Sequence, residues 1–258
     1  MKKGLCALTC ALLTLLVLSP RAEAGKIVLT NDEWTLSNSG FFGPNDPGIF
    51  ATNVTSWFAG GSPGDFLAYS ANFGLTESSL ASAMTSVVGQ TWTVSTAATF
   101  NLATLLTYDG IFLAGPAAGI DTGVLSAYVN AGGNVYLAGG TGSFPSPADE
   151  AAYWNPFLSD FGLGFGSPYN GIEGSIGIIS SHPIFAGVDS LYQNNGNDAL
   201  DIDVLDARGV VLVSSGGHAL YAVFESVPEP VPEPATLLLL GSGLAGLGGA
   251  AWRRHRRK

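Results

Sequence analysis

Tyr108-Asp-Gly-Ile-Phe-Leu-Ala-Gly115 is followed by Asp121-Thr-Gly-Val-Leu-Ser-Ala-Tyr-Val-Asn130 and then by Ala131-Gly-Gly-Asn-Val-Tyr-Leu-Ala-Gly-Gly140. The first and third segments carry short apolar runs bounded by glycine, which is typical of strands buried in a parallel sheet. The middle segment begins with an N-capping aspartate and stops at a pair of glycines, as a helix does. Strand, helix and strand at this spacing predict a βαβ unit.

The flanking residues continue the alternation of strands and helices. Upstream, strands are expected at residues 26–30, 65–70 and 91–95, and helices at 47–58 with Asp46 as N-cap, at 77–88 with Thr76 as N-cap, and at 101–107. Downstream, Asp149-Glu150 is expected to open a helix that carries Trp154, Phe157, Leu158 and Phe161 on one face. Shorter alternating segments predict antiparallel strands at the sheet edge, at 172–179, 200–205, 209–214 and 219–225.

Residues 1–24 have the features of a secretory signal peptide. These are Lys2 and Lys3, an apolar run from Leu5 to Leu18, and the small-residue motif Ala22-Glu23-Ala24. Cleavage by signal peptidase is therefore predicted between Ala24 and Gly25. Both cysteines of the chain, Cys6 and Cys10, lie inside this leader. The mature chain is expected to have no disulfide, no thiolate metal site and no cysteine nucleophile.

The last 32 residues form a second targeting segment with three parts in a fixed order. Residues 227–234 repeat Val-Pro-Glu-Pro, and their prolines favour an extended stalk over a helix. Residues 235–252 are uncharged, and as a helix they would reach about 27 Å, enough to cross a bilayer. Residues 253–258 are mainly basic, which predicts a cytoplasmic tail. The segment thus predicts a C-terminal transmembrane helix with the body outside.

This tail resembles the PEP-CTERM sorting signal, which is also catalogued as the ice-binding-protein C-terminal domain. Val231, Pro232, Glu233 and Pro234 match the sorting motif, and a Leu/Gly-rich span and an arginine cluster follow them. The resemblance covers residues 231–258 and implies recognition by exosortase, a membrane protease of Gram-negative bacteria that make exopolysaccharide. It implies export through the inner membrane, and then either anchoring by the C-terminal helix or release to the cell surface or extracellular matrix.

The body between the two targeting segments, residues 25–226, is strongly acidic. It contains two basic residues, Lys26 and Arg208, and seventeen acidic ones, which gives a net charge of −15. Such a surface repels phosphate backbones, so nucleic-acid binding is excluded. With only two basic partners available, the stability of the fold must rest mainly on apolar burial and backbone hydrogen bonds.

The body also resembles the class I glutamine amidotransferase-like superfamily. The resemblance lies in Tyr108–Leu113, in Leu125–Leu137 and in His182-Pro-Ile-Phe-x-Gly-Val188. It implies a flavodoxin-like three-layer α/β/α sandwich with a mainly parallel sheet and an antiparallel edge. Active members carry a cysteine on a sharp turn from strand to helix. Here that position falls in Gly139-Gly140-Thr141-Gly142, so the resemblance implies a body without the catalytic cysteine.

Three sets of side chains are candidates for chemistry in the body. Thr141 with His182 or His218 could form a divergent hydrolase site, although an isolated histidine is more often structural. Four aspartates, Asp198, Asp201, Asp203 and Asp206, could bind calcium, although strand alternation also explains their spacing. Aromatic residues could stack on sugars, although most lie at core spacing: Trp34, Phe41, Phe42, Trp57, Trp92, Trp154 and Tyr169.

Taken together, the sequence predicts an exported, non-enzymatic protein of the cell surface or of an exopolysaccharide matrix such as a biofilm, with no cofactor. Its expected partners are signal peptidase, exosortase, the membrane and exopolysaccharide. Two alternatives stay open. One is a divergent hydrolase of the amidotransferase-like fold, and the other is a calcium-dependent glycan-binding module.

Overall fold

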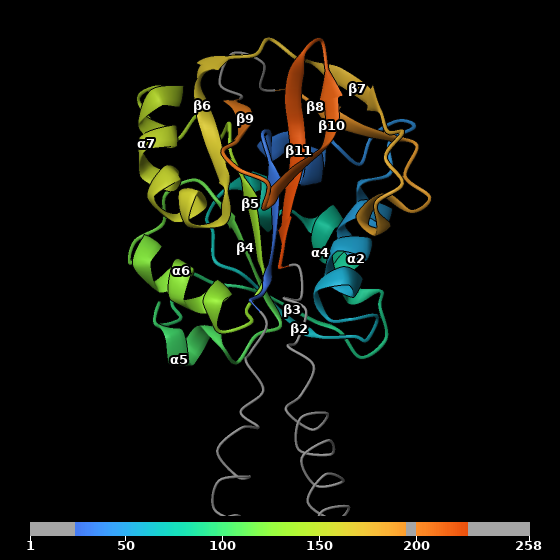
Figure 1. The fold of residues 1–258 in the computed structure, drawn as a ribbon. Coiled ribbons are helices and arrows are strands. Elements are labelled where there is room, and N and C mark those ends of the chain that lie inside the picture. Colours follow the sequence, from blue (N-terminus) through green and yellow to red (C-terminus); the bar gives the residue numbers. More distant parts are fainter. Residues whose placement is uncertain (1–23, 195–199, 227–258) are drawn as a thin grey trace, which may run out of the picture. The chain divides into compact units, whose positions relative to one another are not determined.

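A central seven-stranded sheet with helices on both faces forms the body of the protein (Figure 1). The computed structural model describes residues 24–194 and 200–226. The strands of this sheet, in spatial order, are β10 (Gly209–Ser215), β11 (His218–Glu225), β1 (Lys26–Thr30), β5 (Val135–Ala138), β4 (Gly110–Ala114), β2 (Asp65–Ala68) and β3 (Thr91–Val94). Strands β1, β5, β4, β2 and β3 are parallel, whereas β11 runs antiparallel to both of its neighbours, β1 and β10. The predicted mainly parallel sheet is confirmed.

The order of the parallel strands differs from that of an ordinary flavodoxin-like sheet in one respect. Read from β3 to β1, the order is that of flavodoxin, 2-1-3-4-5, if β2 is counted first and β1 is counted fifth. The chain is therefore a cyclic permutation of that order. As a consequence, the first strand lies in the interior of the sheet, between β5 and β11.

Helices cover both faces and bury one apolar layer on each. One layer contains α5 (Leu102–Leu105), α6 (Thr122–Asn130) and α7 (Pro147–Leu158), and the other contains α2 (Pro47–Phe58), α3 (Phe73–Thr76) and α4 (Ser78–Thr85). Alternate residues of each strand enter opposite layers, as the pleat requires: in β1, Ile27 and Leu29 face one layer and Val28 faces the other. The three-layer arrangement follows from this alternation.

The antiparallel segments predicted at the sheet edge separate into three places. Only β10 and β11 join the main sheet. β9 (Leu200–Val204) pairs with β6 (Leu163–Tyr169), and β7 (Gly174–Gly177) pairs with β8 (Ser190–Gln193), each as a separate two-stranded sheet. The short helices η1 (Glu33–Leu36), η2 (Ser159–Phe161) and η3 (Pro183–Phe185) complete the body.

The structure confirms Asp46 as the N-cap position of α2, without a side-chain hydrogen bond, and corrects two other expected helix starts. Asp46 makes no side-chain cap of α2, because its Oδ2 accepts hydrogen bonds from the N–H groups of Asp189 and Ser190 instead. The N-cap of α4 is Glu77, and Thr76 closes the separate helix α3. The remaining start is that of α7, which is capped by Ser146 and not opened at Asp149.

The buried face of each helix follows the prediction with two exceptions. Trp154, Phe157 and Leu158 of α7 are fully buried, and so are Leu80 and Met84 of α4. Ile49 and Val88 have the apolar spacing of the buried helix residues, which predicts burial, but they are exposed, Val88 by 92%. Val88 lies beyond the end of α4 at Thr85, so the helical spacing no longer applies to it.

Within the described residues, none of the helices has both the length and the apolar character needed to cross a membrane. The predicted transmembrane helix at 235–252, the stalk at 227–234 and the leader up to residue 23 lie outside these residues.

Candidate functional site

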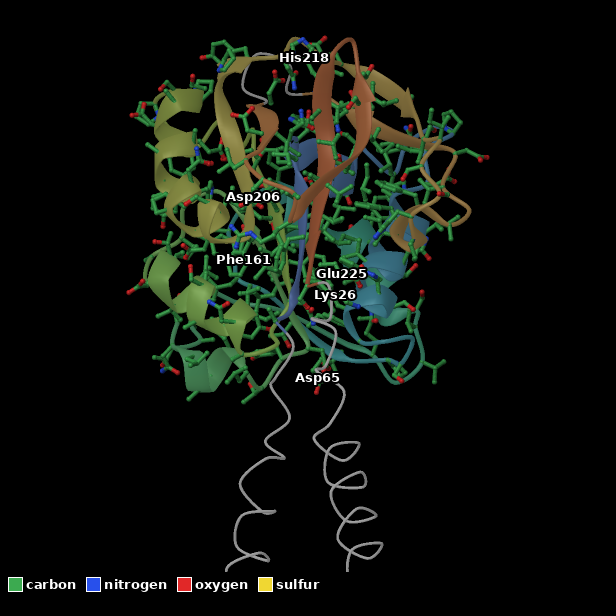
Figure 2. All side chains as sticks on the ribbon, in the orientation of Figure 1. Lys26, Asp65, Phe161, Asp206, His218 and Glu225 are labelled. Carbon is green, nitrogen blue, oxygen red and sulfur yellow. The ribbon has the colours of Figure 1, made fainter. Side chains whose placement is uncertain are left out.

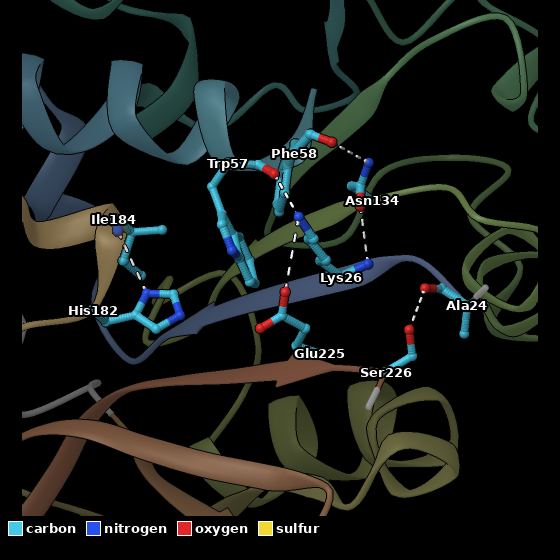
Figure 3. Close-up of polar contacts among 9 residues, drawn as sticks. All are labelled: Ala24, Lys26, Trp57, Phe58, Asn134, His182, Ile184, Glu225 and Ser226. Carbon is cyan, nitrogen blue, oxygen red and sulfur yellow. Dashed lines mark hydrogen bonds and ion pairs between the residues drawn. The ribbon is translucent and has the colours of Figure 1, made fainter. Parts of the chain in front are cut away.

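The first and last strands of the body lie side by side, so both chain ends of the body meet at one edge of the sheet. β1 and β11 are antiparallel partners, with Lys26 opposite Glu225. Figure 3 shows Ala24, just before β1, and Ser226, just after β11, next to each other at this edge. The Ser226 hydroxyl donates a 2.9 Å hydrogen bond to the Ala24 carbonyl oxygen. This hydrogen bond therefore joins the last residue of the predicted leader to the last residue of the body.

Gly25 is tightly enclosed at this edge. It is buried, and its N–H donates a 2.7 Å hydrogen bond to the Val129 carbonyl oxygen in the last turn of α6. A Cβ atom on Gly25 would lie 1.8 Å from the carbonyl oxygen of Gly133, a distance that no side chain could tolerate. The backbone of the glycine pair at 132–133 thus leaves room only for glycine at position 25.

Lys26, one of the two basic residues of the body, connects β1 to α2. Its Nζ donates a 2.7 Å hydrogen bond to the Trp57 carbonyl oxygen at the C-terminal end of α2 and lies 4.6 Å from the centre of the Trp57 ring. The Glu225 carboxylate is 4.0 Å away, at the outer limit of an ion pair. A positive charge at a helix C-terminus is stabilised by the helix dipole. Lys26 therefore holds the end of α2 against the start of β1.

The neighbouring side chains extend this junction. Asn134 accepts a hydrogen bond from the Lys26 N–H and donates one to the Phe58 carbonyl oxygen (Figure 3). It also donates to the Asp109 carbonyl oxygen. A cavity of about 270 Å³ lies beside it, lined by Lys26, Asn53, Ser56, Trp57, Gly60, Gly61 and Pro183. Lys26 stands out in the sequence as the single lysine of the body, whereas Asn134 has no such signal.

His182 also lies at this edge, where it contacts Trp57 and η3. Its ring meets the Trp57 ring edge-on, with 5.1 Å between centres, and its Nδ1 accepts a hydrogen bond from the Ile184 N–H. Burial lowers the pKa of His182, the negative charge of Glu225 raises it, and the positive charge of Lys26 lowers it further. The residue caps η3 and so has the structural role expected for a histidine before proline.

The opposite edge, where the parallel strands end, carries the glycine-rich turn. Thr141 donates from Oγ1 to Glu150 Oε1 at 2.9 Å and from its N–H to Oε2 at 3.2 Å, and Glu150 is only 2% exposed. Gly140 has a positive φ of 62°, and residues 139–146 separate β5 from α7. The sharp strand-to-helix turn that the amidotransferase resemblance implies is therefore replaced by a loop, and the Thr141 hydroxyl is held by a buried carboxylate.

Further buried polar groups gather after the end of β1. Asp32 is fully buried and accepts hydrogen bonds from the N–H groups of Trp34 and Asn194, while the neighbouring Asn31 side chain makes no hydrogen bond within the described protein. Burial raises the pKa of Tyr136 and of Tyr221, and the charge of Asp32 raises both further, so both hydroxyls stay protonated. None of these residues is among the candidates predicted from sequence, although three polar residues, Asn31, Asp32 and Glu33, directly after a buried strand are a recognisable signal.

The crevice between β2 and β4, where the strand order reverses and doubly wound proteins commonly bind ligands, is bridged by side chains. Ser70 Oγ donates a 2.7 Å hydrogen bond to the Ala114 carbonyl oxygen, and the Tyr69 hydroxyl donates to the Ala118 carbonyl oxygen at 2.8 Å. These bonds join the two loops that would otherwise form the walls of a ligand site.

The three proposed hydrolase residues do not converge. His182 lies at the edge where β1 begins, whereas Thr141 follows the other end of the parallel strands. His218 starts β11, and its Nδ1 lies 2.8 Å and 2.9 Å from the two carboxylate oxygens of Asp201. Figure 2 shows His218 and Glu225 at opposite ends of β11. Thr141 and His182 are therefore not grouped, whereas His218 forms a pair with Asp201.

The calcium candidates are dispersed among other partners. Asp206 is bound by the Arg208 guanidinium, with Nη2 2.7 Å from Oδ2, and this hydrogen bond lowers the pKa of Asp206. Asp201 pairs with His218, Asp203 is exposed, and Asp198 lies outside the described residues. Across the part of the chain that the structure describes, no three His, Cys, Asp or Glu side chains are arranged to hold a metal ion. Asp201, Asp203 and Asp206 thus form no calcium site by themselves.

Comparison with known protein families finds one motif, at the C-terminal end of the chain. Residues 230–257 match the model of the PEP-CTERM protein-sorting motif, which confirms the predicted sorting segment. The motif indicates export, sorting to the cell surface and processing by exosortase. No curated protein and no solved structure matches the chain. The assignment therefore rests on the tail, and the amidotransferase-like resemblance of the body stays a prediction.

Proposed function

We propose that the protein is a non-enzymatic component of the cell surface or of an exopolysaccharide matrix, with the α/β body as the part that is delivered. The observation that carries the proposal is the sorting motif at residues 230–257. The acidic body, with its net charge of −15, suits an extracellular protein that must stay soluble. After export, the protein is either held by its C-terminal helix or released once exosortase has cut the tail.

The arrangement of the body supports delivery as a folded unit. Its first and last strands, β1 and β11, are antiparallel partners, with Lys26 opposite Glu225. Removing the segments on either side therefore leaves both strands paired with their neighbours. The non-enzymatic role is supported by the Thr141 hydroxyl, which is engaged by Glu150 instead of by a histidine base.

Replacing Val231, Pro232, Glu233 and Pro234 by alanine tests this proposal in the native host. We expect the wild-type protein in the surface or matrix fraction and the alanine variant retained in the inner membrane with an unprocessed C-terminus. A matched variant at an exposed body position, Val88→Ala, should behave as wild type. Equal surface levels for the motif variant and the wild type would contradict the proposed sorting.

A second candidate function is a divergent hydrolase, and one observation favours it. Asp201 holds Nδ1 of His218, as the carboxylate of a catalytic triad holds its histidine, so that Nε2 could act as a base. His218→Ala and Asp201→Asn would then abolish hydrolysis of ester or amide substrates by the purified protein. Equal hydrolysis by both variants and the wild type would exclude this pair as the source.

A further inference from the structure

The peptide bond predicted to be cut by signal peptidase is held on both sides by the folded body. Its carbonyl oxygen, on Ala24, accepts the hydrogen bond from Ser226, and its N–H, on Gly25, donates to Val129. A protease binds its substrate as an extended segment and uses these same backbone groups. The folded body therefore cannot present this bond to an enzyme without opening.

The parts that enclose Gly25 come from distant and later regions of the chain. The Val129 carbonyl and the glycine pair at 132–133 follow it by more than a hundred residues, and Ser226 is at the far end of the body. β1 itself pairs with β5 on one side and with β11 on the other. Because of the permuted strand order, the first strand cannot be fully enclosed before the last strand of the body is available.

We infer that removal of the leader precedes completion of the sheet, and that the folded body then binds the new N-terminal glycine at the end of α6. The inference rests on the proposed export of the protein. Cleavage converts the Gly25 N–H into an ammonium group beside the Val129 carbonyl, in the last turn of α6, where the helix dipole favours a positive charge. The close approach of Gly133 restricts this position to glycine.

The test uses the full-length precursor in detergent micelles with purified signal peptidase. One sample is folded before the enzyme is added, and the other is unfolded in urea and diluted directly into the enzyme. We expect cleavage between Ala24 and Gly25 in the unfolded sample and at least a hundredfold slower cleavage in the folded one. Equal rates would overturn the inference. No cleavage in either sample would instead contradict the leader, and with it the proposed export.

Two variants separate protection by the fold from a general effect of the micelle. Phe224→Ala removes a buried ring of β11 at the position paired with Ile27 of β1, and it should raise the cleavage rate of the folded precursor at least tenfold. Val88→Ala changes a residue that is 92% exposed and should leave the precursor protected. If circular dichroism shows that the Phe224→Ala variant is less stable than the wild type, but signal peptidase cleaves both folded precursors equally slowly, the inference is wrong.

Discussion

Replacing Lys26 by methionine removes one charge at the junction of β1 and α2 and keeps the apolar stem of the side chain. The Nζ hydrogen bond to the Trp57 carbonyl is a charged one, worth about 1.5–3 kcal/mol. The contact with the Trp57 ring adds about 0.5–1 kcal/mol. Water can replace part of the hydrogen bond to the Trp57 carbonyl, because the Lys26 side chain is 25% exposed. We expect a loss of about 2 kcal/mol, which lowers the melting temperature of a body of about 200 residues by about 4–8 °C.

The assay is thermal unfolding of the purified mature protein, followed by circular dichroism. Glu225→Gln is the matched control, because it removes only the ion pair at 4.0 Å and should lower the melting temperature by about 1 °C or less. A Lys26→Met variant that melts with the wild type would refute the role given to Lys26. If Glu225→Gln were as costly as Lys26→Met, the ion pair and not the carbonyl bond would hold the junction.

Three further predictions concern single groups. Burial lowers the pKa of His182, so protonation of its ring should destabilise the fold as the pH falls below about 6.5, the pKa of histidine in the unfolded chain. His182→Gln should therefore reduce the fall of the urea midpoint between pH 7.5 and pH 5. Thr141→Val leaves one oxygen of the buried Glu150 without its hydroxyl donor and should cost about 1–3 kcal/mol in urea unfolding, whereas Thr141→Ser should cost less. Millimolar calcium should leave the melting temperature unchanged, because Asp206 is bound by Arg208; an upward shift would contradict this assignment.

The sequence predicted the parts of the fold that depend on local chemistry. The segment from Gly110 to Ala138 forms strand, helix and strand as expected, because its apolar runs are short and its helix has an aspartate cap at Asp121 and glycines behind it. The cap is real, since Asp121 Oδ1 accepts hydrogen bonds from the N–H groups of Gly123 and Val124. Local signals of this kind need no knowledge of the rest of the chain.

What the sequence did not predict depends on distant partners. Lys26–Thr30 reads as a buried strand, but nothing within it reveals that its neighbours are β5 and β11. Asp46 has the sequence signature of a helix cap, yet its carboxylate binds Asp189 and Ser190, more than 140 residues away. The Thr141–His182 pairing and the calcium cluster are absent from the described residues for the same reason: spacing places residues on one face, whereas a site requires separate elements to meet.

The central claim is that the acidic body is exported, with the leader directing export and the sorting segment directing processing by exosortase. Intact-mass spectrometry of the protein from its native host tests this claim most directly. The account predicts a mature chain that begins at Gly25 and has lost the basic residues 253–258 through processing of the sorting segment. A cytosolic protein with the mass of the full chain, from Met1 to Lys258, would contradict it.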